Sequence, residues 1–167
     1  MLNLKGEKAK GLSMQKIHAK VFYLPNYDKS WGPMTYAHDT DTGFDIRACN
    51  TEDIVLAPNE RKVIPAGFKI MPQTGFALQI RARSGNASKF GLGLVNGVGT
   101  IDNGYLGEIG IIVINLGSEN ITIARGTKIA QGVVEPVLQF EFEEVLDEKD
   151  LGSTQRGEGG FGSTGTK

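Results

Sequence analysis

The sequence predicts an all-β protein built as a single domain, and three observations carry this prediction. Glycine accounts for 23 of the 167 residues, about 14%, which is roughly twice its average share. Because a glycine inside a helix costs about 1 kcal/mol, this composition argues against a helix-dominated protein. Turn signals recur about every 8–12 residues between short apolar segments, which is typical of a sandwich or jelly roll. The length is sufficient for one buried core.

The candidate strands follow one another along most of the chain. Two segments, 44–48 and 76–82, alternate apolar and polar residues, so we expect each to be a half-buried strand. A nearly continuous apolar run at 109–116 is typical of a strand buried on both faces. The remaining candidate strands are 20–24, 53–56, 62–64, 121–123 and 129–133.

Little of the chain has a helical pattern. One short candidate, SGNASKFG at 84–91, begins with Ser84, a suitable N-cap. We expect a disordered leader or expression remnant at 1–15, a β domain at 16–150 and a mobile glycine-rich C-terminal arm at 151–167. Six of the last 16 residues are glycine, so this arm cannot form a core strand by itself.

Charge, cysteine content and hydropathy exclude several classes of protein. Eighteen Lys and Arg against 19 Asp and Glu leave a net charge of -1, which does not suit a nucleic-acid binder. One cysteine and two histidines cannot make a Cys/His zinc site, so zinc-dependent nucleobase deaminases are excluded. No apolar run approaches the ~20 residues that span a bilayer, and the first residues have no secretory apolar region. We expect a cytoplasmic protein (nuclear or in the host cytosol, depending on its source) that is not secreted.

The first segment whose residues suit binding or catalysis is RARSGNASK at 81–89. A strand ends at Arg83, and a turn opens with Ser84 and Gly85. Free backbone N–H groups at such a turn, together with a guanidinium and a hydroxyl, suit an anion such as phosphate. An ordinary strand-to-turn junction with a solvated arginine remains the alternative.

The second segment is LVNGVGTIDNGYLGEIG at 94–110. Its Asn103-Gly104 pair is the strongest short signal for a hairpin, with Asp102 before the turn and Tyr105 after it. A carboxylate on a rigid turn can orient a water while nearby bare backbone reads a planar base. An Asx-type turn without function is the alternative.

The third segment is the tail. GEGGFG matches a dinucleotide-binding pattern, but no strand and helix flank it, so we reject that interpretation. Arg156, Ser163 and Thr164 can bind phosphate, and Phe161 can stack on a base, so the tail suits a lid. A flexible tail without function is the alternative.

Taken together, five segments in order resemble the motifs of the trimeric dUTP diphosphatase (dUTPase) family. The resemblance extends from about residue 19 to residue 165. The segments are TGFDIRA at 42–48, RSGNASKFGL at 83–92, GTIDNGYLGEIG at 99–110, RGTKIAQ at 125–131 and RGEGGFGSTG at 156–165. The last is the most specific of the five.

The resemblance implies a β-clip, jelly-roll-like subunit that hydrolyses dUTP to dUMP and pyrophosphate. This reaction limits uracil incorporation into DNA and supplies dUMP for dTTP synthesis. Three copies of the chain are expected to share each active site as a homotrimer, with no nucleic acid or membrane partner. The implied cofactor is Mg²⁺, held by the triphosphate and waters without a direct protein ligand, with Asp45 supporting its water shell.

The resemblance also assigns roles to individual residues. Asp102 would hold and deprotonate the attacking water, and Tyr105 would lie under the deoxyribose and exclude a 2′-hydroxyl. Residues expected to read uracil are Asn96, Gly99, Thr100, Ile101 and Gly110. Residues expected to bind the phosphates are Arg83, Ser84, Gly85 and Gln131. The arm would add Arg156, Gly162, Ser163 and Thr164 at the phosphates, with Phe161 stacked over uracil.

The chain departs from the family pattern in a few places. Ala82 stands where proline is common, and Thr127-Lys128 replaces an Asp-Arg pair. Residues 26–31 look like an insertion to which we assign no role. Two alternatives stay open: a dCTP deaminase on the same fold, against which the complete tail motif argues, and a module that senses uracil nucleotides without catalysis.

Overall fold

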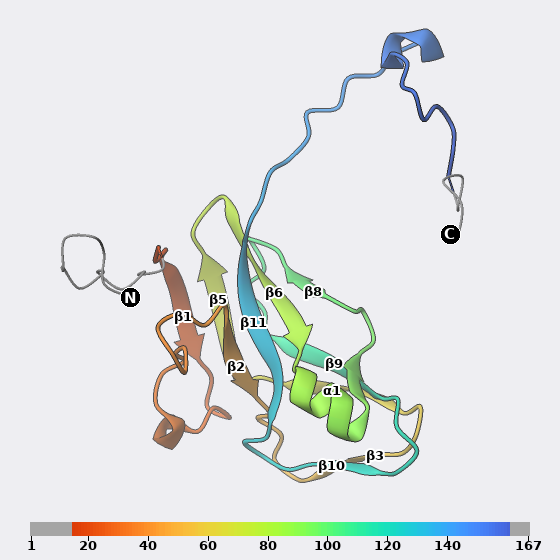
Figure 1. Ribbon diagram of the computed structural model, residues 1–167. Coiled ribbons are helices and arrows are strands. Elements are labelled where there is room, and N and C mark those ends of the chain that lie inside the picture. The colour runs from red at the N-terminus through yellow and green to blue at the C-terminus, as the bar shows by residue number, and fades with distance from the viewer. Residues whose placement is uncertain (1–14, 161–167) are drawn as a thin grey trace, which may run out of the picture. The chain divides into compact units, whose positions relative to one another are not determined.

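The computed structural model describes residues 15–160 (Figure 1). The chain divides after Val137 into two compact units. The first unit holds all the strands of the described residues, which confirms the all-β prediction. These strands are β1 (Ala19–Tyr23), β2 (Gly43–Arg47), β3 (Ile54–Leu56), β4 (Arg61–Pro65), β5 (Phe68–Pro72), β6 (Phe76–Ala82), β7 (Leu92–Leu94), β8 (Gly99–Ile101), β9 (Gly110–Asn115), β10 (Ile121–Ile123) and β11 (Lys128–Pro136).

Antiparallel pairing organises these strands into small sheets. A four-stranded sheet has the order β2-β11-β6-β8, and a three-stranded sheet has the order β4-β9-β7. Two further pairs, β1-β5 and β10-β3, complete the unit. The long strand β11 lies between β2 and β6, as Figure 1 shows.

The core forms from the inward side chains of these sheets. Ile46 and Leu78 come from the four-stranded sheet, and Ile111 and Val113 come from β9; all are almost completely buried. Burial of one such side chain stabilises the fold by about 1.5–3 kcal/mol. The predicted alternation at 44–48 is confirmed, because its apolar members are buried and its charged members are half-buried.

The predicted burial of 109–116 on both faces is wrong for the isolated chain. Ile111 and Val113 are buried, but Ile112 is 36% exposed and faces the same side as Val63, its partner on β4, which is 64% exposed. The sequence could not distinguish these cases, because apolar side chains also occur on the exposed face of a strand.

One α-helix, α1 (Ser84–Phe90), follows β6, in agreement with the predicted helical segment. Arg83 rather than Ser84 is the N-cap, and it makes no capping bond through its side chain. Ser84 and Gly85 therefore begin the first helical turn, where backbone N–H groups have no intrahelical acceptor. Gly91 ends the helix in the left-handed conformation, with φ of 72°.

The described part of the second unit, 138–160, contains no strand, and its one helical turn is η2 (Glu148–Leu151). Leu138, Phe140 and Phe142 are 96%, 85% and 90% exposed. The predicted boundaries at 15/16 and 150/151 stay predictions. No helix among residues 15–160 is long and apolar enough to cross a membrane.

Gly132 on β11 is required by close packing, because a Cβ at this position would overlap the Phe44 ring. We expect Gly132→Ala to push Phe44 out of its place in the core and to lower the free energy of unfolding by about 1–3 kcal/mol. Urea denaturation of both proteins measures the difference. Gly104→Ala is the control, since nothing lies within 4 Å of its Cβ position; equal losses in both variants would contradict the packing argument.

Candidate functional site

A polar cavity of about 400 Å³ opens where β2, β11 and the start of α1 meet. All four residues predicted to bind phosphates line it: Arg83, Ser84, Gly85 and Gln131. Asp45, predicted to support a metal-bound water shell, lines it too. The structure thus brings the second motif together with residues of the first and fourth motifs.

Five cavity residues were missed by the sequence analysis, and three of them have polar side chains: His38, Asp41 and Thr42. The His38 backbone N–H donates to Asp41 Oδ2 at 2.9 Å, and the Asp41 N–H donates to the His38 carbonyl at 3.0 Å. These bonds form a tight turn that supplies one wall of the cavity. Its polar composition was visible in the sequence, but polar residues are common in any loop, so the signal was weak.

The register of β11 brings two polar side chains, Gln131 and Lys128, to the face of the sheet that carries Asp45. Gln131 pairs with Asp45 on β2 and with Arg81 on β6, so its side chain shares the face of Asp45. Gln131 Nε2 donates to the Ala82 carbonyl at 2.9 Å, which orients the amide. The pairing with β2 then shifts between Lys128 and Ala130. This β-bulge places Lys128 opposite Arg47 and hence on the cavity's side of the sheet.

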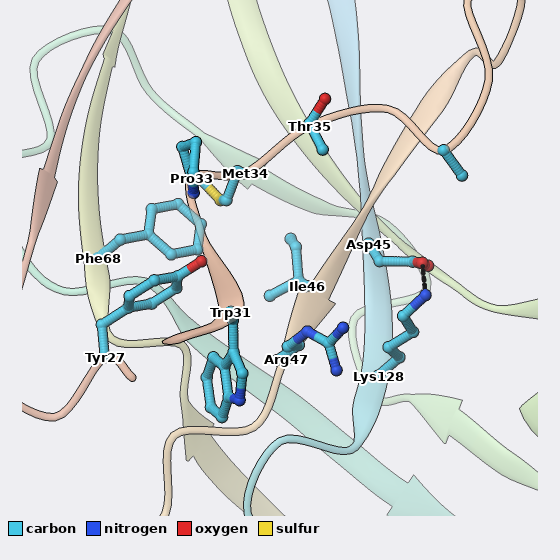
Figure 2. Close-up of a pocket in the computed structure, with 11 residues that line it drawn as sticks. Tyr27, Trp31, Pro33, Met34, Thr35, Asp45, Ile46, Arg47, Phe68 and Lys128 are labelled. Atoms are coloured by element: carbon cyan, nitrogen blue, oxygen red, sulfur yellow. Dashed lines mark ion pairs between the residues drawn. The ribbon is translucent and has the colours of Figure 1, made fainter. Parts of the chain in front are cut away.

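Two cations are organised around Asp45. Its Oδ1 lies 2.9 Å from Arg83 Nε, and its Oδ2 lies 2.6 Å from Lys128 Nζ; Figure 2 shows the second pair. Partial burial by itself raises the pKa of Asp45, but the hydrogen bonds and charges of Lys128 and Arg83 outweigh it and leave the pKa below its usual value. Asp45 is therefore ionised at neutral pH, and the three groups together carry one net positive charge.

The carboxylates of this cavity do not fit a metal ion held directly by the protein. Both Asp45 oxygens contact cations, and Asp41 Oδ2 accepts a backbone N–H. Among residues 15–160 no group of three Asp, Glu, His or Cys side chains could hold a metal.

The third motif forms a loop at 102–109 between β8 and β9. The Tyr105 N–H donates to the Asp102 carbonyl at 3.1 Å, and Asn103 Nδ2 donates to the Pro72 and Gln73 carbonyls at 3.2 and 3.1 Å. The predicted turn at Asn103-Gly104 is present, but the predicted hairpin is wrong. Strand β8 pairs with β6, whereas β9 pairs with β4 and β7, so the loop connects two sheets.

The predicted uracil-reading residues lie on and before β8. A Cβ on Gly99 would come within 3.1 Å of Asn96 Nδ2, so the Asn96 amide lies beside the Gly99 backbone. Gly99, Thr100 and Ile101 pair with Ile80, Gln79 and Leu78 on β6, respectively. Gly110 lies apart from them at the start of β9, opposite Pro65.

Within one chain, the second and third motifs occupy opposite ends of β6. Asp102 follows Ile101, which pairs with Leu78 near the start of β6. Ser84 lies just beyond the other end of this strand. Ser84 lies six positions after Leu78, which is roughly 20 Å of extended chain. That distance is longer than a triphosphate, so the predicted site residues of one chain form two separate groups, a phosphate half-site and a base half-site.

The arm contributes one described site residue, Arg156. Its Nε donates to the Gly159 carbonyl at 2.6 Å, so the guanidinium closes a local turn. The other predicted arm residues, Phe161, Gly162, Ser163 and Thr164, lie outside the described residues.

Comparisons with known proteins show which family the chain resembles. The family model for dUTPase matches residues 29–165. The deoxyuridine 5'-triphosphate nucleotidohydrolase of Clostridium kluyveri is 48% identical over 131 residues, which cover 78% of this chain and 88% of the relative. The enzyme of the same name from Bdellovibrio bacteriovorus is 45% identical over 152 residues, which cover 91% of this chain and 99% of the relative.

Solved structures show the same likeness. A dUTPase variant of Staphylococcus bacteriophage 80alpha with dUpNHpp has a TM-score of 0.76 at 27% identity, covering 89% of this chain and 98% of that one. A dUTPase variant from phage phi11 of S. aureus, whose structure describes a structural Mg(II) ion, has a TM-score of 0.69 at 26% identity, covering 79% of this chain and 99% of that one. The predicted family, jelly-roll-like fold and enzyme class are confirmed, and the chain belongs to the dUTPase family.

Proposed function

We propose that this chain hydrolyses dUTP to dUMP and pyrophosphate by attack of water on the α-phosphate. The observation that carries the proposal is the cation-lined cavity, in which Arg83, Ser84, Gly85 and Gln131 converge in a member of the dUTPase family. The phage 80alpha relative was solved with dUpNHpp, a ligand of the same nucleotide class. By limiting dUTP and supplying dUMP, the enzyme would act on the nucleotide pool, and we propose a cytoplasmic location.

The phosphate half-site acts by electrostatic stabilisation. Charge that develops on phosphate oxygens in the transition state is stabilised by fixed donors that need no reorganisation. Arg83 is such a donor, because Asp45 holds its Nε and the Lys128 carbonyl accepts from its Nη1 at 3.2 Å. Ser84 and Gly85 add backbone N–H groups from the first turn of α1.

The base and water half-site lies on the 102–109 loop and β8. Asp102 is exposed, and its backbone is held in a turn that Asn103 anchors to the β5–β6 connection. A carboxylate held in this way acts as a general base, taking a proton from the attacking water. Tyr105 would form the platform under the deoxyribose, and β8 with Asn96 would read uracil through backbone groups and one amide.

A homotrimer with shared active sites would join the half-sites. The separation of Asp102 from Ser84 along β6 supports this proposal, because a second copy of the chain could then supply the missing half of one site. Two apolar surfaces are available for such contacts: Val63 with Ile112 on the first unit, and the alternating apolar residues 138, 140 and 142 on the second. The number three rests on the family resemblance, as does the delivery of Arg156 and Phe161 from a third copy.

Mg²⁺ is the proposed cofactor. It would neutralise charge on the triphosphate, and its ligands would be phosphate oxygens and waters, since the protein offers no cluster of carboxylates among the described residues. We keep Asp45 as the proposed support for the ion's water shell.

Replacing Asp102 tests the general base. We expect Asp102→Asn to lower kcat for dUTP by at least about 10²-fold, because an amide cannot take a proton from water. Its melting temperature should stay unchanged, since the side chain is exposed. Asp53→Asn, a change at another exposed aspartate, is the matched control. Release of dUMP by Asp102→Asn at the wild-type rate would overturn the proposed role.

Truncation after Asp150 tests the arm. Because all described strands end by Pro136, we expect the shortened protein to keep its thermal melting transition while dUMP release is abolished. Arg156→Ala in the full chain should show part of the same loss. Undiminished turnover by the truncated protein would show that the arm takes no part in catalysis.

A nucleotide panel tests the substrate and the metal together. We expect pyrophosphate from dUTP, far less from dCTP, dTTP and UTP, and loss of turnover when EDTA removes Mg²⁺, with recovery on adding the ion back. Release of ammonia from dCTP would instead support the deaminase alternative.

A further inference from the structure

The insertion at 26–31 is tightly held against the first unit. Figure 2 shows Tyr27 and Trp31 with Arg47 around one pocket. The Trp31 ring lies 5.6 Å from the Arg47 guanidinium carbon and 5.5 Å from that of Arg125, both within the range of cation–π attraction. Tyr27 packs edge-on against Trp31, with ring centroids 5.4 Å apart.

Arg125 fixes the backbone at the start of this insertion. Its Nη2 donates to the Asn26 carbonyl at 2.6 Å, while its Nη1 donates to the Cys49 and Asn50 carbonyls at 3.3 and 3.1 Å. Leu24, just before the insertion, donates its N–H to the Gly67 carbonyl at 2.8 Å. Asn26 is therefore held on a rigid support rather than on a free loop.

The Asn26 side chain reaches the third motif. Its Nδ2 donates to Glu108 Oε1 at 2.9 Å, and the same oxygen accepts the backbone N–H of Gly67 at 2.9 Å. Gly67 is buried, so its N–H depends on this carboxylate as an acceptor. The carboxylate of Glu108 thus ties the 102–109 loop to two other segments of the unit.

Glu108 in turn holds Tyr105. The Tyr105 hydroxyl donates to the Glu108 carbonyl at 3.0 Å. A Cβ at Gly107 would overlap the Tyr105 ring, so the ring folds back closely over this stretch of backbone. The position of the Glu108 backbone therefore determines the orientation of the Tyr105 ring.

We propose that Asn26 and Glu108 are positioning residues that orient Tyr105 and thereby set the enzyme's preference for deoxyribose over ribose. The inference deepens the proposed function and rests on it, since it takes Tyr105 as the platform under the sugar. The insertion then has a role: it carries the side chain that steadies Glu108. A ribose 2′-hydroxyl is excluded sterically only if the ring cannot move away, so discrimination depends on how firmly the ring is held.

The test measures kcat/KM for dUTP and for UTP in the full-length protein. We expect Asn26→Ala and Glu108→Ala each to lower the ratio of the two values by roughly tenfold, as expected for a small misplacement of a contact group. Glu108→Gln, which keeps an acceptor oxygen, should recover most of the preference. The double variant Asn26→Ala with Glu108→Ala should be no worse than Glu108→Ala alone, because Asn26 acts through Glu108.

Glu60→Ala is the matched control. Glu60 also accepts a backbone N–H, from Ala57 at 2.8 Å, but it lies in the turn before β4. We expect this variant to keep the wild-type ratio. If Glu108→Ala does not fold, Asn26→Ala alone tests the proposal, because this variant keeps the hydrogen bond from the Gly67 N–H to the Glu108 carboxylate.

The outcomes separate the inference from the proposed function. Wild-type protein that fails to release dUMP from dUTP would overturn the proposed function. The positioning role alone would be overturned by a different result. In that case the wild-type protein prefers dUTP over UTP, and Asn26→Ala and Glu108→Ala lower the melting temperature but leave the ratio of kcat/KM values unchanged.

Discussion

The register of β11 between β2 and β6 is the constraint on which the phosphate half-site depends. Because side chains alternate along a strand, a shift of one residue would turn Gln131 into the core and bring its apolar neighbours out to solvent. In the observed register Gln131 faces the cavity opposite Asp45. Val133, two residues further along β11, lies on the same face as Gln131 but is buried. Gly132 lets the Phe44 ring pack against the strand.

The β-bulge between Lys128 and Ala130 adds a second element to this constraint. Lys128 and Gln131 are three positions apart, so a regular strand would place them on opposite faces. The bulge inserts one residue and brings both to the face that carries Asp45. Lys128 can then share Asp45 with Arg83, and the ion cluster holds the arginine in place for an anion. Backbone pairing thus determines the electrostatics of the site.

Under the proposed function, the division of the site residues between two ends of β6 would give an assembly of copies a catalytic role. A site complete in one chain would function in a monomer, whereas half-sites about a strand length apart would become active only when copies of the proposed trimer meet. In one chain the apolar side chains of Val63 and Ile112 are open to water, so the proposed assembly would also gain stability by covering them.

The sequence by itself determined the fold class, the family and five of the residues that line the polar cavity: Asp45, Arg83, Ser84, Gly85 and Gln131. Composition, period-two alternation and ordered motifs are local properties of the sequence, so they do not depend on how the strands pair. Only the tertiary structure decided that the Asn103-Gly104 turn connects two sheets, that Lys128 faces Asp45, and that the insertion at 26–31 is tied to Glu108. These features depend on which strand pairs with which, and on contacts between residues as far apart as 26 and 108. Local patterns carry no information about such partners, because the same alternating strand can pair equally well with several neighbours.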